Sequence, residues 1–311
     1  APIIVERGDD VEERAAAVER FYKTRVLDTD SNIQFGAGGA GTFSDGKLKV
    51  GSMDKYKMKV LRTFVECGAD EEILYSVGAH VGTDVLSGIV EKIRKRIISL
   101  GGEVNFGSRL EKIHLCDGKV VGGRIQCGEN TFDFDTAILI MATGHSARDS
   151  FEMLRDINAP LERRGFGIGM RIEHPREYVN RLVYGDNYPE SIGTASYHLV
   201  THLKSGRSVY SFCMCPGGVV VPAASEIGGI VTNGMSESRR CADNSNCALL
   251  VSVTPDDFPS DDIFAGLDLQ RNIEKRAFLA AGGDYKAPAT SLASFLAKEK
   301  ATLGNVKPSY A

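Results

Sequence analysis

The 311-residue sequence lacks any apolar run long enough to span a bilayer, and its start shows no signal-peptide pattern. It also lacks a strong excess of charge. The formal net charge is −4, so nothing in the composition indicates a nucleic acid or a membrane surface as a partner. Internal repeats and low-complexity tracts are absent too. What remains is an ordinary globular composition, and the length allows two domains with cores of their own.

Several catalytic motifs are missing. Residues 34–48 are rich in glycine but contain no GKS or GKT, so they are not a Walker loop, and they form no clean GxGxxG after a strand. No nucleophile elbow with ordered Ser, Asp and His partners occurs, which gives hydrolase chemistry no support. No spacing of cysteine and histidine matches a zinc site, so we predict no metal.

The cysteines and the chain ends bear on context. Seven cysteines, an odd number scattered over a long chain, indicate free thiols in a reducing, cytoplasmic setting. The sequence begins inside an apolar strand without a methionine, and residues 307–311 add no closing element. We therefore expect a fragment of a longer protein.

Residues 136–149, TAILIMATGHSARD, are the stretch around which we expect the fold to be organised. A short run that is apolar at every position predicts a strand at residues 136–141, buried on both faces as in a parallel α/β sheet. The small residues Ala142, Thr143 and Gly144 then allow a ligand to approach the backbone. Ligands of open α/β sheets bind at the carboxyl ends of strands, so this stretch predicts a binding edge.

Residues 34–48, QFGAGGAGTFSDGKL, hold five glycines, too many for the interior of a helix or strand. Such a loop exposes backbone N–H groups that can bind an anion or lie against a flat ligand. A flexible loop is the alternative, and the ordered mix of Phe35, Thr42, Phe43, Ser44 and Asp45 favours a binding loop.

The remaining pattern predicts an α/β first half and a β-rich second half. Helices are expected at residues 11–23, 56–67, 71–77, 84–100 and 151–157, with strands at 3–5, 103–106, 110–115, 120–126 and 131–134. From about residue 160 the strands are short and mostly antiparallel, with helices at 175–183 and 266–281. We therefore expect domains at residues 1–159 and 160–311.

Six segments resemble the FAD-dependent oxidoreductases known as NAD(P)/FAD-dependent dehydrogenases, two-domain flavoproteins of glutathione-reductase-like topology. The resemblance covers essentially the whole chain and implies a Rossmann-like FAD-binding domain beside a β-rich α+β substrate domain. The long loop and CMCPGG are the specific matches. The segments are IVERG (4–8), NIQFGAGGAGTFSDGKL (32–48), ATGHSARD (142–149), GMRIEHP (169–175), YSFCMCPGG (210–218) and TNGMS (232–236).

The resemblance also implies roles for individual positions. An acid after the strand at residues 3–5, which matches the second Rossmann strand of the family, holds the adenosine ribose. The glycine-rich loop passes the pyrophosphate, ribityl chain and flavin ring, and the small residues after 141 line the cofactor near its pyrophosphate. The implied cofactor-binding residues are Glu6, Arg7, Gly38, Gly39, Gly41, Thr42, Phe43, Ser44, Leu110, Ala142, Thr143 and Gly144.

The sequence departs from this family at both ends. The first Rossmann strand, with its GxGxxG turn and helix, would precede residue 4, and that helix N-terminus supplies the main pyrophosphate site. The C-terminal segment that returns to the flavin is absent as well. We therefore expect an incomplete FAD/NAD(P)-binding domain that holds FAD weakly or not at all.

Cys213 and Cys215 follow a strand and would share one face of it, about 7 Å apart. That separation is long for a disulfide unless the chain bends, as Pro216 and Gly217 allow. A thiol/disulfide relay and two buried structural cysteines are the alternatives, and the second is the commoner role.

Four histidines, His145, His174, His198 and His202, are candidate acid–base groups. His145 is the best placed, at the end of the predicted strand 136–141. Arg148 and Arg171 would bind an anionic substrate or pair with Asp149 and Glu173, and the sequence does not decide between these roles.

The sequence therefore predicts an FAD-dependent oxidoreductase core that passes hydride between flavin and a small-molecule substrate or NAD(P)H. The candidate catalytic residues are His145, Cys213 and Cys215. Alternatives are a non-catalytic flavoprotein-like scaffold and a thiol–disulfide reductase that uses the two cysteines. Neither a nucleic acid nor a membrane is expected as a partner, and the substrate and the oligomeric state stay open.

Overall fold

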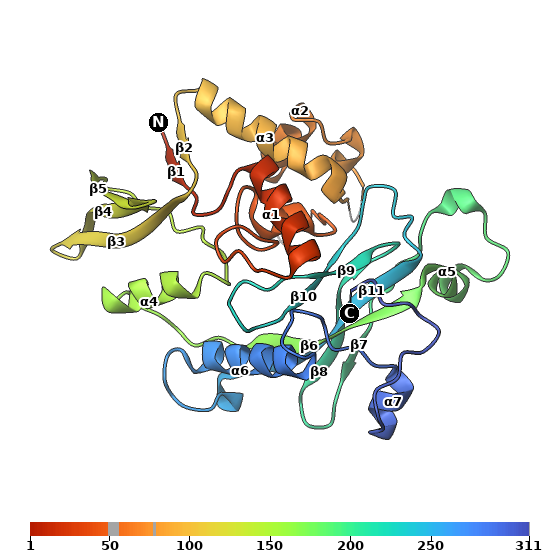
Figure 1. Cartoon of the computed structure of the whole chain (residues 1–311). Helices are drawn as coiled ribbons and strands as arrows, with labels where there is room; N and C mark the ends of the chain where they lie inside the picture. Colours follow the sequence, from red (N-terminus) through yellow and green to blue (C-terminus); the bar gives the residue numbers. More distant parts are fainter. Residues whose placement is uncertain (49–55, 77–78, 311) are drawn as a thin grey trace.

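The computed structural model of the chain describes residues 1–48, 56–76 and 79–310. Helices dominate the first third, and antiparallel strands dominate the part after residue 165 (Figure 1). Among the described residues, no helix has the length and apolar character needed to cross a membrane. The architecture is mixed α/β, and the strands of the described residues form four separate sheets.

The first unit is a parallel strand pair with helices beside it. Strand β1 (Ile3–Val5) pairs with β2 (Glu103–Asn105), and Ile4 lies opposite Val104. Helix α1 (Val11–Thr24) begins at Asp10, whose side chain accepts a hydrogen bond from the Val11 N–H. The other elements of this region are η1 (Gly39–Phe43), α2 (Lys57–Glu66), η2 (Glu71–Leu74) and α3 (Thr83–Ser99).

These elements confirm the helices predicted at residues 11–23, 56–67 and 84–100. The helix predicted at residues 71–77 is shorter, since η2 ends at Leu74 and residue 77 lies outside the described residues.

A three-stranded antiparallel sheet follows β2. It consists of β3 (Ser108–Cys116), β4 (Lys119–Cys127) and β5 (Asn130–Asp135) in that order, and it projects away from the large sheet (Figure 1). The turn between β3 and β4 is Asp117-Gly118, and both residues have positive φ (50° and 73°), as a tight hairpin turn requires.

The strand predicted at residues 136–141 is wrong. None of these residues is in a strand, and Ile138 and Ile140 are 78% and 82% exposed. An extended segment becomes a buried strand only when neighbours pair with its backbone, and no described strand pairs with residues 136–141. The run is apolar as the sequence shows, but no sheet of the described residues includes it.

The second half is built on a four-stranded antiparallel sheet in the order β6-β11-β8-β7, which confirms the antiparallel prediction. A short β9-β10 pair lies between this sheet and α1 (Figure 1). The elements are α4 (Arg148–Asp156), β6 (Phe166–Pro175), α5 (Arg176–Tyr184), η3 (Glu190–Ile192), β7 (Val200–His202), β8 (Ser208–Cys215), β9 (Val219–Pro222), β10 (Thr232–Met235), β11 (Asn244–Val253), η4 (Pro255–Asp257), α6 (Ala265–Ala280) and α7 (Leu292–Ala297).

One hydrophobic cluster joins the two halves. Val18 of α1 and Ile33 pack against Val221 of β9 and Ala223. Arg148 of α4 is buried and pairs with Glu226 and, at 2.7 Å, with Glu274 of α6. Arg148 therefore does not form the local pair with Asp149 that the sequence left open. The boundary near residue 160 stays a prediction, and apolar contacts cross it.

The glycine-rich loop is held from inside by Arg14 of α1. This side chain is 0% exposed, and its guanidinium donates to the carbonyl oxygens of Asn32 (2.9 Å), Ile33 (3.0 Å) and Ala37 (2.6 Å). The guanidinium also lies 4.8 Å from the ring centre of Phe43. Burial lowers the pKa of Arg14 to about 10, so the side chain stays charged at neutral pH. A buried cation thus satisfies carbonyl groups that no regular secondary structure pairs.

We predict that Arg14→Met destabilises the protein by about 3 kcal/mol, because several buried carbonyl groups lose their donor at once. Equilibrium urea unfolding measures this loss. Arg20→Met on the same helix is the matched control, since Arg20 is largely exposed and makes one ion pair, with Asp28, at 3.5 Å. That control should change stability by less than about 0.5 kcal/mol. Equal effects of the two substitutions would contradict the role assigned to Arg14.

Candidate functional site

The glycine-rich loop turns its side chains inward and its glycine backbone outward. Thr42 is buried and donates to the Ala37 carbonyl (3.2 Å), and Phe43 packs over Arg14. By contrast, a Cβ built on Gly39 or Gly41 would meet no heavy atom within 4 Å. Two faces of this loop backbone are therefore open to a ligand.

Two further positions shape the loop. Gly38 has a φ of +80°, and a Cβ there would lie 2.2 Å from the Thr42 Oγ1, so only glycine fits. The Ser44 hydroxyl donates to the Gly41 carbonyl (2.9 Å) and closes the far side of the turn. The side chains of Thr42 and Ser44 thus fix the loop, and the glycines provide the exposed surface.

The end of β1 lies directly against this loop. A Cβ on Gly8 would come within 2.6 Å of the Gly36 Cα, so the two backbones touch. One carboxylate oxygen of Glu6 accepts from the Gly8 N–H (2.9 Å). Arg7 forms ion pairs with Asp149 and, at 3.4 Å, with Asp30. The predicted ribose-binding Glu6 therefore stands at one end of the loop.

Residues 142–145 lie exposed beside the same end. His145 is 3.1 Å from the Ser146 hydroxyl through its Nδ1, and that hydroxyl donates to the Gln34 side chain (2.9 Å). A Cβ on Gly144 would meet nothing within 4 Å. We call Glu6–Gly8, the loop of residues 34–44 and residues 142–146 the glycine-rich edge.

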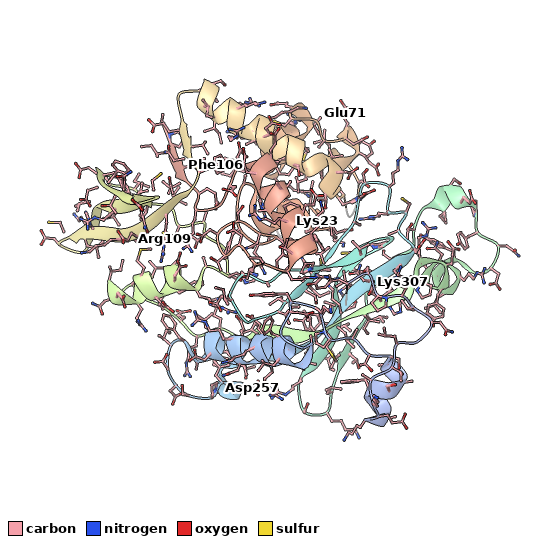
Figure 2. The ribbon with its side chains drawn as sticks, in the orientation of Figure 1. Lys23, Glu71, Phe106, Arg109, Asp257 and Lys307 are labelled. Atoms are coloured by element: carbon pink, nitrogen blue, oxygen red, sulfur yellow. The ribbon has the colours of Figure 1, made fainter. Side chains whose placement is uncertain are left out.

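Leu110 lies outside this edge, on β3, and is half-buried. Its neighbour Arg109 forms an ion pair with Asp149 at 3.0 Å and lies between the hairpin and α4 (Figure 2). The structure thus brings the predicted positions of 6–8, 38–44 and 142–145 together. Their contact with a cofactor stays a prediction.

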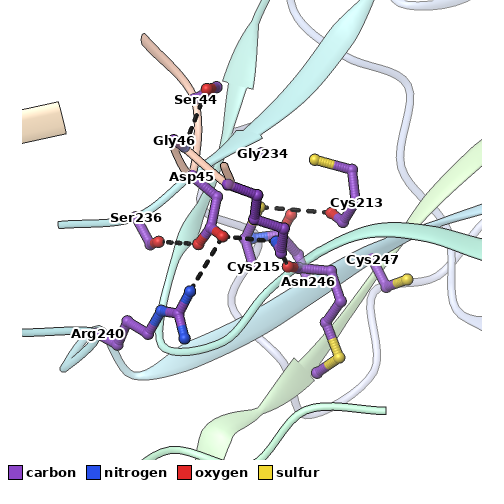
Figure 3. Close-up of polar contacts among 12 residues, drawn as sticks. Ser44, Asp45, Gly46, Cys213, Cys215, Gly234, Ser236, Arg240, Asn246 and Cys247 are labelled. Carbon is purple, nitrogen blue, oxygen red and sulfur yellow. Dashed lines mark hydrogen bonds and ion pairs between the residues drawn. The ribbon is translucent and has the colours of Figure 1, made fainter. Parts of the chain in front are cut away.

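A second cluster forms where the loop ends, around Cys213 and Cys215 of β8 (Figure 3). Between Phe212 and Cys215, two residues of β8 stand opposite one residue of β11, which is a β-bulge. Cys213 has a φ of +44°, which is rare for a residue with a side chain. The bend that the sequence placed at Pro216 and Gly217 therefore already occurs at Cys213.

The loop sends two charged residues into this cluster. Asp45 is 1% exposed and accepts from the Ser236 hydroxyl, from Arg240 (3.2 Å) and from Lys47 (2.6 Å). The Lys47 ammonium also donates to the carbonyl of Met214, the residue between the two cysteines. Asp45 and Lys47 therefore tie the glycine-rich loop to strand β8.

Arg171 of β6 reaches the cluster from the opposite side. Its guanidinium donates to the Cys213 carbonyl (3.4 Å), to the Asn233 side chain (3.3 Å) and to the buried Asn246 side chain. Arg171 thus binds this cluster and makes no pair with Glu173. In residues 1–48, 56–76 and 79–310, Arg171 Nε and Asn246 Nδ2 are buried donors with no acceptor.

These neighbours shift the pKa values of the two thiols in opposite directions. A hydrogen bond from Cys215 lowers the pKa of Cys213 to about 6 against the effect of burial, and the charges of Lys47 and Arg171 lower it further. The hydrogen bond with Cys213 and burial raise the pKa of Cys215. The cluster therefore favours a thiolate on Cys213 and a neutral thiol on Cys215.

The other candidate histidines lie elsewhere. His174 is 2.8 Å from the Tyr197 hydroxyl, and burial lowers its pKa, so it is a neutral packed residue at pH 7. His202 lies in β7 and contacts the Ser208 hydroxyl, whereas His198 precedes that strand. Both are exposed.

Sequence reasoning missed several members of the cluster. Gly234 of β10 is the clearest case. A Cβ there would lie 2.4 Å from both Arg171 Nη1 and Asn246 Oδ1, and 2.6 Å from Cys215 Sγ. Three polar groups therefore converge only because position 234 has no side chain. The TNGMS segment marked Gly234 and Ser236 without giving this reason, while Asn246 and Arg240 carried no signal of their own.

We predict that Gly234→Ala destabilises the protein by about 1–3 kcal/mol, because the methyl group overpacks the contact between Arg171, Asn246 and Cys215. Urea unfolding measures the change. Gly88→Ala is the matched control, because Gly88 is exposed in α3 and a Cβ there meets nothing within 4 Å. That control should be neutral or stabilise by up to about 1 kcal/mol. A Gly234→Ala variant as stable as the control would refute the close approach.

Comparisons with known proteins bear on the cofactor. A protein of Clostridium beijerinckii, described as an uncharacterized protein, is 48% identical over 317 residues, which cover 99% of this chain and 58% of that protein. The chain thus spans a little over half the length of this relative. The solved structure of a triple mutant of the flavin-dependent brominase Bmp2 matches 64% of this chain and 41% of the brominase chain, with 17% sequence identity. The TM-score of this match is 0.29, which is too low to indicate a shared fold. Residues 165–311 match a family described as "FAD-dependent protein, C-terminal domain-like", and this match supports FAD as the cofactor.

Proposed function

We propose that this chain is the core of an FAD-dependent oxidoreductase that passes hydride between flavin and a small-molecule substrate or NAD(P)H. The observation that carries the proposal is the match of residues 165–311 to a family of FAD-dependent proteins. In this proposal, residues 1–159 form the Rossmann-like part of the cofactor site, and residues 160–311 form the substrate domain. The electron acceptor and the choice between NADH and NADPH remain to be measured.

The glycine-rich edge fits a dinucleotide in three respects. The open backbone of Gly39 and Gly41 allows a flat group to lie against the main chain. Glu6 keeps one carboxylate oxygen that does not contact Gly8 and is available for a ribose hydroxyl. The exposed Gly144 adds a second open backbone segment beside Gln34. We therefore assign Glu6, Gly39, Gly41 and Gly144 as the residues that would hold FAD.

When bound, FAD supplies the hydride chemistry, and the protein supplies binding, orientation and electrostatics. The glycine-rich loop begins on the side of Glu6 and ends near Lys47, whose ammonium donates a hydrogen bond to the Met214 carbonyl. Arg171 and Lys47 place two positive charges at that end and would orient an anionic substrate. The exposed His145 is the candidate acid–base group on the side of residues 142–146.

Of the alternatives, the non-catalytic scaffold has no specific observation in its favour. The cysteine chemistry does have one, the thiol cluster of β8. All seven cysteines are free of disulfides. A reducing, cytoplasmic location stays part of the proposal.

We predict that Gly41→Val weakens FAD binding by about tenfold or more, a cost of about 1.4 kcal/mol. The new side chain fills the open face where the cofactor would touch the backbone, and its Cβ meets no heavy atom of the protein within 4 Å. Titration with FAD, followed by flavin fluorescence anisotropy, measures the affinity. Gly88→Val is the matched control and should bind FAD as the unmodified chain does.

The full-length Clostridium beijerinckii relative provides a second arm for the same titration. FAD bound by either protein, with loss in the Gly41→Val chain or at the equivalent glycine, supports the assigned edge. If neither protein binds FAD, the proposal fails. Binding that is unchanged by Gly41→Val would instead remove the glycine-rich loop from the cofactor site.

A further inference from the structure

The β-bulge in β8 brings the sulfur atom of Cys215 against the backbone of Cys213. In a regular strand the two side chains would stand about 7 Å apart along the chain. The left-handed Cys213 and the extra residue shorten this path, and Cys215 Sγ lies 3.5 Å from the Cys213 carbonyl oxygen.

The two cysteines differ in access to solvent. Cys215 is 0% exposed, whereas Cys213 is half-buried and can be reached from outside. A small reagent therefore meets Cys213 first, and Cys215 is reached only through it. This asymmetry is the one needed by an attacking thiol and a resolving thiol.

The surroundings favour negative charge at Cys213. Lys47 comes from the loop and Arg171 from β6, and Asp45 and Cys247 are the opposing groups. The backbone of His80 forms an isolated antiparallel β-bridge with the backbone of Lys47, and burial lowers the pKa of the His80 side chain. The donors Arg171 Nε and Asn246 Nδ2, which have no acceptor among the described residues, belong to the same cluster. A buried donor without an acceptor is costly, so these groups point to an anion in their midst.

We infer that Cys213 and Cys215 form a reversible dithiol–disulfide pair that reduces small disulfides, with Cys213 as the attacking sulfur and Cys215 as the resolving one. This activity goes beyond the proposed flavin chemistry and does not rest on it, because the exchange needs no cofactor.

The reaction balances with a disulfide RSSR′ as the only oxidant. The Cys213 thiolate attacks one sulfur, the S–S bond breaks, and R′S⁻ leaves. Once Cys213 carries no charge, two causes of the raised pKa of Cys215 disappear, so Cys215 gives its proton to R′S⁻. The Cys215 thiolate then attacks Cys213 Sγ and releases RS⁻. The two cysteines lose two electrons, and the substrate gains them.

The test uses the reduced chain without FAD and 2-hydroxyethyl disulfide as the probe. After quenching with an alkylating reagent, mass spectrometry should find Cys213 joined to Cys215. The rate of Cys213 alkylation as a function of pH should have its midpoint near 6, below the value of about 8.5 for an ordinary thiol. The exposed Cys116 and Cys127 serve as internal controls for reagent quality.

Variants separate the two roles. Cys215→Ser should accumulate the mixed disulfide on Cys213, because nothing resolves it. Cys213→Ser should give no adduct at position 215, because that sulfur is buried. Cys127→Ser, a change in the distant hairpin, should leave formation of the pair unchanged.

Three results would overturn the inference, and two of them need no variant. The first is a Cys213 that does not react with the probe in the unmodified chain. The second is a disulfide to Cys247 in place of Cys215. The third is a mixed disulfide on Cys213 that persists equally with and without Cys215. Because FAD is left out, each result is independent of whether the chain binds flavin.

Discussion

The buried guanidinium of Arg14 is the interaction on which the rest of this structure depends. A loop with glycine at every second or third position has little tendency to hold one conformation, because glycine loses more conformational freedom on folding than any other residue. Arg14 offsets that loss by binding three carbonyl groups of residues 32–37 and by packing under Phe43. An ordered loop can then present bare backbone on its outer side.

The fixed loop connects two chemically different places. Its start touches Gly8, its middle holds the open backbone of Gly39 and Gly41, and its end carries Asp45 and Lys47 into the cysteine cluster. Residues from both halves of the chain complete that cluster, because Arg171 comes from β6 and Gly234 from β10.

The sequence predicted local structure well and pairing poorly. The periodicity of α3 and the Asp117-Gly118 turn depend on neighbours in sequence, and both are confirmed. Residues 136–141 failed because burial of a strand depends on partners far away, which no local pattern reports. The cysteine pair was visible as CxC. The reasons for its asymmetry are Lys47, Asn246 and the missing side chain at Gly234, which lie 19 to 168 residues from Cys215 in the chain. Folding brings them together, so they could not be read from spacing.

Hydrogen–deuterium exchange of the whole chain, with and without FAD, tests the central claim that the Arg14-held loop is the binding element. The account predicts that FAD slows exchange in residues 36–44 and 142–146 and leaves the β3–β5 hairpin sheet unchanged. Slower exchange confined to other segments, or no change in residues 36–44 at concentrations where FAD binds, would contradict it.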